Sequence, residues 1–174
     1  MTGKTFFNAL ANGEKDVLAL LLELLEEEKA AYCLIGGLAV NAYAEPVVSL
    51  DLDLVVVADA LGSLCRAAAG KGFTVHHFPH SVNLSLKGSD LRVQLQTDER
   101  YQEFIARAST REVLGYSLRV AALEDVLQGK SWAYADTQRR ASKRQKDLAD
   151  IMRLVEAHSQ LKQSVSPEIQ RLLT

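Results

Sequence analysis

Apolar and polar positions alternate along the chain with two different periods, which predict helices and strands in a mixed order. Between residues 17 and 25, apolar residues recur every three or four positions. This spacing predicts a helix over about residues 13–30, with Asn8 or Asn12 as its N-cap. Short apolar runs bounded by turn residues predict strands at Tyr32–Ile35, Leu50–Val57, Phe73–Phe78, Val82–Leu86 and Leu91–Gln96. The last strand is the clearest, because its apolar and polar residues alternate strictly, as in a strand with one buried face.

The second half of the chain is predicted to be mainly helical. A hairpin turning at Gly115 is followed by helical patterns over Leu123–Tyr134, over about residues 137–162 and after Pro167. Shorter helices are predicted at Leu38–Glu45, Asp59–Gly70 and Glu99–Arg107. This order predicts an α+β fold, in which a mixed β-sheet flanked by helices carries a C-terminal helical cap. We expect residues 1–121 to form the core and residues 122–174 to form a helical region packed on it.

Composition narrows the class of protein without naming a function. The chain has 174 residues, a net charge of −2, ten Gly, three Pro and two Cys, which excludes collagen-like, disordered and disulfide-scaffold proteins. The longest apolar-rich stretch, Val17–Leu25, is too short to span a membrane, and Met1–Leu10 does not resemble a secretory signal. We therefore predict a cytoplasmic protein in which Cys33 and Cys65 remain reduced.

The strongest chemical signal is a pair of carboxylates in an apolar strand. Asp51 and Asp53 are two residues apart, so both side chains should lie on the same face of the sheet. Two like charges held together are costly to desolvate, and a divalent cation is the natural compensation. Mg²⁺ in proteins often binds one or two carboxylates together with substrate phosphates. The pair therefore predicts a metal site, while an exposed pair on an edge strand is the simpler alternative.

A glycine pair precedes these carboxylates. Gly36 and Gly37 lie between a predicted strand and a predicted helix, where glycine permits a tight turn and a close approach of a ligand to the backbone. Free N–H groups at the start of a helix favour phosphate. The two signals together predict a site for a phosphorylated ligand, although the glycines alone would indicate only a turn.

These motifs resemble the nucleotidyltransferase-fold superfamily, the DNA polymerase beta-like group, and above all its small bacterial abortive-infection and toxin–antitoxin members. The family pattern is an apolar residue and two glycines, a helix, then T-x-D-h-D; here it reads Ile35-Gly36-Gly37 and Ser49-Leu50-Asp51-Leu52-Asp53. The segment Ser142–Leu154 is similar to a K-D-x-x-D-h segment of the family's helical cap. The resemblance covers roughly residues 32–154.

Three positions depart from the family pattern. Val47 stands where an Arg is frequent, and Ser49 replaces the Thr. The third carboxylate of the family, on a later strand, corresponds to Gln94, which carries no charge and cannot act as a general base. Asp90 and Asp98 share the face of Gln94, but each lies about 13 Å away along an extended strand.

The resemblance implies a Mg²⁺-dependent transfer of a nucleotidyl group from an NTP to a protein or RNA acceptor. In this interpretation Asp51, Asp53 and Gln94 form the catalytic set, with the two carboxylates holding Mg²⁺. Gly36, Gly37, Ser49 and Lys130 would contact the nucleotide. The alternative is a catalytically impaired module that binds a nucleotide or a small helical partner protein, as one half of a toxin–antitoxin pair. Gln94 is the residue that distinguishes the two hypotheses.

Three other motifs are interpreted as structural. His76, His77 and His80 lack the additional ligands of a metal site and are predicted to be exposed. The basic residues of the long helix are predicted to form a solvated face paired with nearby acids: Arg139, Arg140, Lys143, Arg144 and Lys146. A surface for nucleic acid or nucleotide phosphate is the other possibility for that run. Arg153 and His158 have the spacing of a small ribonuclease toxin, but the rest of that pattern is missing.

Overall fold

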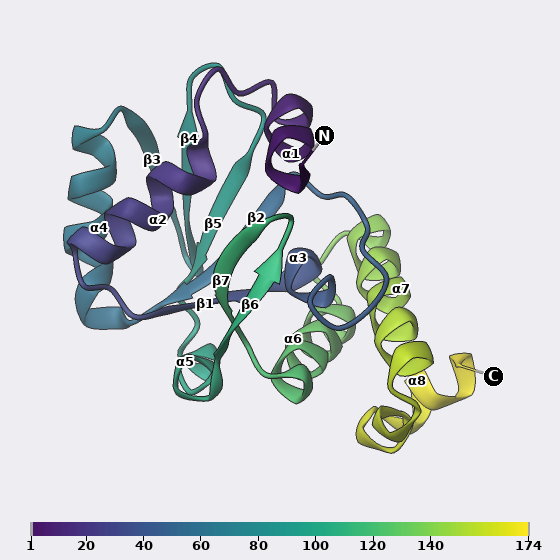
Figure 1. Cartoon of the computed structure of the whole chain (residues 1–174). Coiled ribbons are helices and arrows are strands. Elements are labelled where there is room, and N and C mark those ends of the chain that lie inside the picture. Colours follow the sequence, from purple (N-terminus) through teal and green to yellow (C-terminus); the bar gives the residue numbers. More distant parts are fainter. Residues whose placement is uncertain (1, 174) are drawn as a thin grey trace.

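A single mixed sheet of seven strands organises the computed structural model, which describes residues 2–173 (Figure 1). The strand order is β3-β4-β5-β2-β1-β7-β6. The strands are β1 (Tyr32–Ile35), β2 (Asp51–Val56), β3 (Phe73–Phe78), β4 (Ser81–Leu86), β5 (Arg92–Gln96), β6 (Ser109–Val113) and β7 (Tyr116–Val120). Strand β2 runs antiparallel to β1 and parallel to β5, so the sheet is mixed, as predicted.

Helices cover the sheet and extend from one end of it (Figure 1). They are α1 (Gly3–Leu10), α2 (Val17–Glu27), α3 (Gly36–Val40), α4 (Ala58–Gly70), α5 (Phe104–Arg107), α6 (Leu123–Ala135), α7 (Ala141–Ala157) and α8 (Pro167–Leu172). Two 3-10 turns, Glu99–Tyr101 and Ser159–Ser164, complete the list. Helix α4 packs against β3 and α2 packs against α4, whereas α3, α6 and α7 pack against one another. This second group stands beside the end of β2 that carries the carboxylates.

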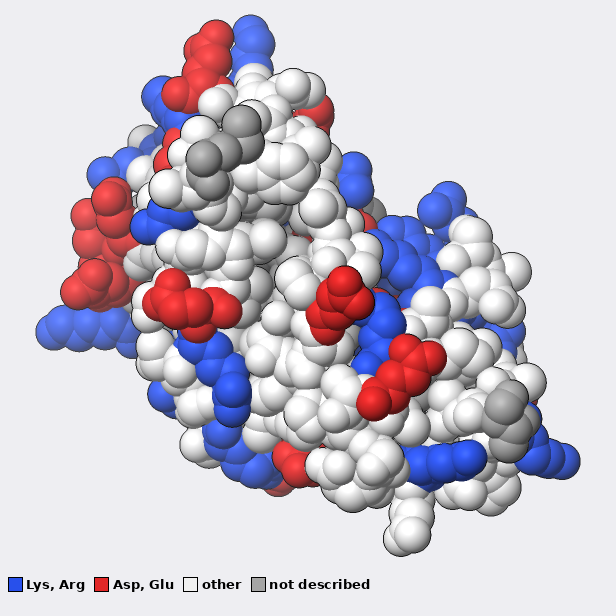
Figure 2. All heavy atoms as spheres, turned by 45° about the vertical axis from the view of Figure 1, so that its right-hand side comes forward, with Lys and Arg blue, Asp and Glu red and all other residues white. Residues whose placement is uncertain are grey.

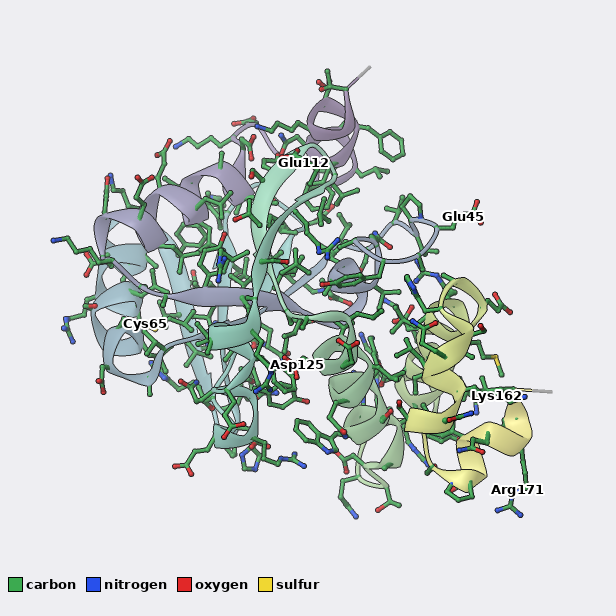
Figure 3. The ribbon with its side chains drawn as sticks, turned by 60° about the horizontal axis from the view of Figure 1, so that its bottom comes forward. Glu45, Cys65, Glu112, Asp125, Lys162 and Arg171 are labelled. Carbon is green, nitrogen blue, oxygen red and sulfur yellow. The ribbon has the colours of Figure 1, made fainter. Side chains whose placement is uncertain are left out.

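An ion pair between an exposed arginine and a buried aspartate joins helix α5 to the start of helix α6. Arg107 at the end of α5 donates two hydrogen bonds, of 2.8 and 2.9 Å, to the carboxylate of Asp125 in the first turn of α6. Asp125 lies near the middle of the molecule in Figure 3 and is buried. The division into a core at 1–121 and a helical region at 122–174 remains a prediction. Within residues 2–173, no helix is long and apolar enough to cross a membrane.

The predicted elements are present, but several of their ends differ. Helix α1 was not predicted, and α2 begins only at Val17, where Asp16 rather than Asn8 or Asn12 is the N-cap. The Asp16 carboxylate accepts a hydrogen bond from the amide of Ala19 and another from the Tyr116 hydroxyl, each 2.9 Å long. This cap therefore depends on a residue 100 positions away in the sequence.

Tertiary contacts also shorten two other helices. Helix α3 ends at Val40, and Asn41 exchanges hydrogen bonds with the backbone of Val47 to hold the loop that follows. Helix α7 spans Ala141–Ala157 instead of residues 137–162. It ends where His158 leaves the helical conformation and its Nε2 lies 2.7 Å from the carbonyl oxygen of Tyr43.

Candidate nucleotide site

The glycine pair and the second carboxylate meet where β1 ends. Ile35 pairs with Asp53, and Gly36 follows at the start of α3 with a φ of +72°. A Cβ at Gly36 would lie 3.0 Å from Cβ and Cγ of Asp53 and would overlap its Oδ2. Only glycine fits there, because the position combines a left-handed backbone with close contact to a carboxylate. At Gly37 a Cβ would make an ordinary contact, 3.6 Å from Oδ2 of Asp150.

Asp53 is the more enclosed of the two carboxylates. Burial raises its pKa, and the neighbouring charge of Asp51 acts in the same direction. Lys130 and Arg139 oppose this shift without cancelling it. A carboxylate in this condition gains from an additional cation, because the cation stabilises its ionised form.

Asp51 is held by three basic side chains. Its Oδ1 accepts a hydrogen bond from Nε of Arg92 at 2.6 Å, and its Oδ2 lies 3.4 Å from Nζ of Lys143 and 4.0 Å from Nζ of Lys146. Burial opposes ionisation of Asp51, but these contacts, led by Arg92, outweigh it and lower the pKa. The Ser49 hydroxyl accepts a hydrogen bond from the Asp51 amide at 3.2 Å, which fixes the entry to β2.

Gln94 lies directly beside Asp53 on the neighbouring parallel strand. The two acids that could have replaced it are engaged elsewhere. Asp90 accepts a hydrogen bond from Asn12, and Asp98 caps the 3-10 turn at Glu99–Tyr101 while pairing with Arg100 at 2.7 Å. Strand β5 therefore places an uncharged amide, and not a carboxylate, beside Asp53.

Lys130 lies inside a buried ion network between α6 and α7. Its Nζ is 2.9 Å from Oδ1 of Asp147 and 2.7 Å from Oδ2 of Asp150. Arg139 pairs with the other oxygen of Asp147 at 2.7 Å, and Arg153 pairs with Asp150 at 2.8 Å. Burial alone would lower the pKa of Lys130, but the two carboxylates outweigh it and raise the pKa.

These groups surround a cavity of about 430 Å³, a volume within the range of small-molecule sites. Its charged lining consists of five basic side chains against three acidic ones, a net charge of +2: Arg92, Lys130, Arg139, Lys143, Lys146, Asp51, Asp53 and Asp147. Gly37, Ser49 and Gln94 also line it. Basic side chains are numerous on the part of the surface formed by the C-terminal helices (Figure 2).

The run of basic residues from Arg139 to Lys146 begins before α7, and only part of it forms the predicted solvated face. Arg139, Lys143 and Lys146 line the cavity rather than forming only a solvated face. Arg144 faces elsewhere, since its Nε donates to the carbonyl oxygen of Tyr134 at 2.7 Å. Successive residues of a helix point in different directions. The sequence of this basic run alone therefore did not show which of its side chains face the cavity and which face solvent.

The three histidines of the H-H-x-x-H motif lie in different places. His76 and His77 are both exposed, but His76 lines the cavity, whereas His77 alternates to the other face of β3. His80 lines a separate cavity beside Arg100 and Trp132. The prediction that all three are exposed is confirmed, and the pairing of β3 with β4 additionally places His76 in the cavity lining.

Arg153 and His158, the pair with ribonuclease-like spacing, serve structural contacts. Arg153 bonds to Asp150 and to Oδ1 of Asn41, and His158 bonds to the Tyr43 carbonyl. Sequence reasoning gave no site role to Arg92 or Asn83, which both line the cavity. The alternation of Leu91–Gln96 places Arg92 on the face of Gln94, but nothing local indicated Asn83.

No family model matches the chain, and no curated protein does either. Solved structures do match. ANT(2'')-Ia in complex with adenylyl-2''-tobramycin is 16% identical, with a TM-score of 0.58 over 90% of this chain and 92% of that one. The chain has the nucleotidyltransferase fold.

Two further structures show the same fold. The lincosamide antibiotic adenylyltransferase LnuA, bound to lincomycin, is 14% identical with a TM-score of 0.54, over 79% of this chain and 95% of that one. An antigenic nucleotidyltransferase-like protein from Paracoccidioides brasiliensis is 18% identical with a TM-score of 0.56, over 90% of each chain. At these identities the likeness concerns the fold, so the function depends on the site itself.

Proposed function

We propose that the protein is a nucleotidyltransferase that moves the nucleotidyl group of an NTP to a hydroxyl group. The observation that carries this proposal is the close contact of Gly36 with Asp53, a carboxylate that lines a cationic cavity. A turn that accepts only glycine keeps the backbone close to the carboxylate, so a polyphosphate can approach both. The net positive lining favours a ligand with several negative charges.

The residues suit a magnesium-bound nucleotide. Within residues 2–173, no group of three or more His, Cys, Asp or Glu side chains is placed to hold a metal by itself. Two carboxylates, Asp51 and Asp53, with the amide oxygen of Gln94 beside them, are the oxygen donors that Mg²⁺ uses when phosphates complete its coordination. When bound, Mg²⁺ would neutralise charge on the phosphates.

Each part of the cavity has a distinct task in this proposal. Gly36, Gly37 and Ser49 contact the phosphates on the α3 side. Lys143 and Lys146 bind the phosphates from α7, which stabilises the negative charge that passes to the pyrophosphate leaving group. For Lys130 the proposal differs from the sequence prediction: its ammonium group lines the cavity but is paired with Asp147 and Asp150, which favours a positioning role. It positions α7 against α6 and supplies positive potential near Asp53.

The acceptor is predicted to be a protein hydroxyl or an RNA end. The solved neighbours add a third candidate, because two of them are described with tobramycin and lincomycin, which are small molecules. A panel should therefore include an RNA oligonucleotide, a mixture of cellular proteins, tobramycin and lincomycin. Radiolabel from [α-³²P]ATP should move to at least one of them.

A double substitution tests the nucleotide site directly. Asp51→Asn with Asp53→Asn should abolish Mg²⁺-dependent ATP binding, measured by calorimetry, because it removes both anionic metal ligands. Lys15→Gln provides a control that lies outside the cavity lining. Normal ATP binding by the double variant would show that the site assignment is wrong.

The second candidate function is a nucleotide- or partner-binding module without transfer activity. Gln94 beside Asp53 favours it, because the family position of a third carboxylate carries no charge here. The pairing of Asp51 with Arg92 also favours it, since that carboxylate is already neutralised. ATP binding with no labelled product across the acceptor panel would support this module, and a small helical partner protein would then be sought.

A further inference from the structure

Four polar side chains form a row across the sheet through the cavity. Asp53 pairs with Gln94, Gln94 pairs with Asn83, and Asn83 pairs with His76, on four neighbouring strands. Residues directly opposite one another on paired strands present their side chains on the same face. All four line the same cavity. The row therefore leads from the candidate metal ligands to an imidazole on the edge strand β3.

Asn83, in the middle of the row, has an incomplete hydrogen-bond arrangement. Its Oδ1 is buried, and among residues 2–173 no group donates a hydrogen bond to it. Buried amide oxygens are nearly always satisfied by a protein donor or by water. In a polar cavity, the missing donor is a water or a hydroxyl group of a ligand.

The proposed reaction needs a group that takes the proton of the attacking hydroxyl. Gln94 cannot accept that proton, and Asp51 is held by Arg92 and Lys143. His76 is the remaining group of the row whose side chain is a typical general base. It faces Asn83 in an antiparallel pair, where opposite Cα atoms lie about 4.5–5.5 Å apart.

We propose that His76 is the proton acceptor of the transfer reaction and that Asn83 holds the water connecting it to the attacking hydroxyl. This inference rests on the proposed function. The water donates one hydrogen bond to Asn83 Oδ1 and one to an imidazole nitrogen of His76, and it accepts one from the hydroxyl. Three polar partners are typical of a buried water.

The step balances in atoms and electrons. The acceptor oxygen forms a bond to the α-phosphorus while the bond from that phosphorus to the bridging oxygen of pyrophosphate breaks. Pyrophosphate leaves with the electron pair of the broken bond. The hydroxyl proton passes to the water, and the water passes one of its own protons to the imidazole. His76 then releases its proton to solvent.

The test compares adjacent histidines that face opposite sides of one strand. His76→Gln should lower kcat for nucleotidyl transfer by about 10²-fold or more, the contribution of a positioned base. Calorimetric binding of Mg²⁺·ATP should stay within about twofold of wild type, because no nucleotide ligand is removed. His77→Gln, on the face of β3 away from the cavity, should leave both quantities unchanged.

A rescue experiment separates proton transfer from a general structural effect. Gln94→Asp places a carboxylate beside Asp53, where it can accept the proton without His76. In the Gln94→Asp background, His76→Gln should therefore change kcat by less than about tenfold. An equal loss of kcat in both backgrounds would overturn the role of His76.

The remaining outcomes also decide the question. Unchanged kcat in His76→Gln, with normal transfer by the wild type, would overturn the inference and leave the proposed function intact. ATP binding without transfer to any acceptor would overturn the inference and support the binding module. Absence of Mg²⁺·ATP binding by the wild type would overturn the proposed function itself, and the inference with it.

Discussion

Replacing Lys130 by Met should destabilise the protein strongly, because it removes the cation from a buried ion network. Lys130, Asp147 and Asp150 are 7%, 2% and 5% exposed, so water cannot replace the lost ammonium group. Removing one member of a buried ion pair costs about 3–5 kcal/mol. Arg139 and Arg153 still pair with the two carboxylates, which places the expected loss at the lower end, about 3 kcal/mol.

Urea denaturation followed by circular dichroism measures this loss. A thermal scan should show a corresponding fall in Tm of roughly 6–12 °C, at about 2–4 °C per kcal/mol for a chain of this length. Lys143→Met makes the same chemical change on a side chain that is 40% exposed. An exposed pair contributes about 0–1 kcal/mol, so this control should remain close to wild type.

The pH dependence of the same variant provides a second check. The pKa of Lys130 is raised above its ordinary 10.5, so its contribution to stability is complete below that pH and is lost as the pH rises through the raised value. The difference between wild type and Lys130→Met should therefore be the same at about pH 7 and about pH 9. A difference below about 1 kcal/mol at neutral pH would refute the reasoning, because a buried ammonium group could not contribute so little.

Three further predictions concern the cavity. Gly36→Ala should lower the free energy of unfolding by about 1–3 kcal/mol and abolish ATP binding, since its φ is +72° and its Cβ would overlap Asp53. Gly37→Ala should leave the free energy of unfolding unchanged, and an equal loss of stability in urea titrations of the two variants would contradict the fit. Gln94→Asp should increase the rate of labelled nucleotide transfer, by up to about 10²–10⁴-fold, and an unchanged rate would show that the row does not limit catalysis. Asp51→Asn with Asp53→Asn should cost less than about 1 kcal/mol of stability in urea titrations, because the Arg92 pair is exposed and burial disfavours the Asp53 charge; global unfolding would mean that the pair is structural.

The motifs that point to a nucleotide site are local in the sequence. The alternation of apolar and polar residues in Leu91–Gln96 determines that Gln94 shares a face with Arg92, whatever strand lies beside it. The two-residue spacing of Asp51 and Asp53 likewise determines that both carboxylates face one side. These features depend on backbone periodicity alone, so they can be recognised without a structure.

The tertiary structure decided which distant groups meet those motifs. The parallel register of β2 and β5 places Arg92 beside Asp51, 41 positions away in the sequence, and so neutralises a carboxylate that the pattern presented as free. Packing of α6 on α7 encloses Lys130, which the family resemblance had assigned to phosphate. Strand pairing through β4 brings His76 into the cavity. None of these contacts can be predicted from the residues around it in the sequence. Each depends on strand register or helix packing between segments that are far apart along the chain but close in space.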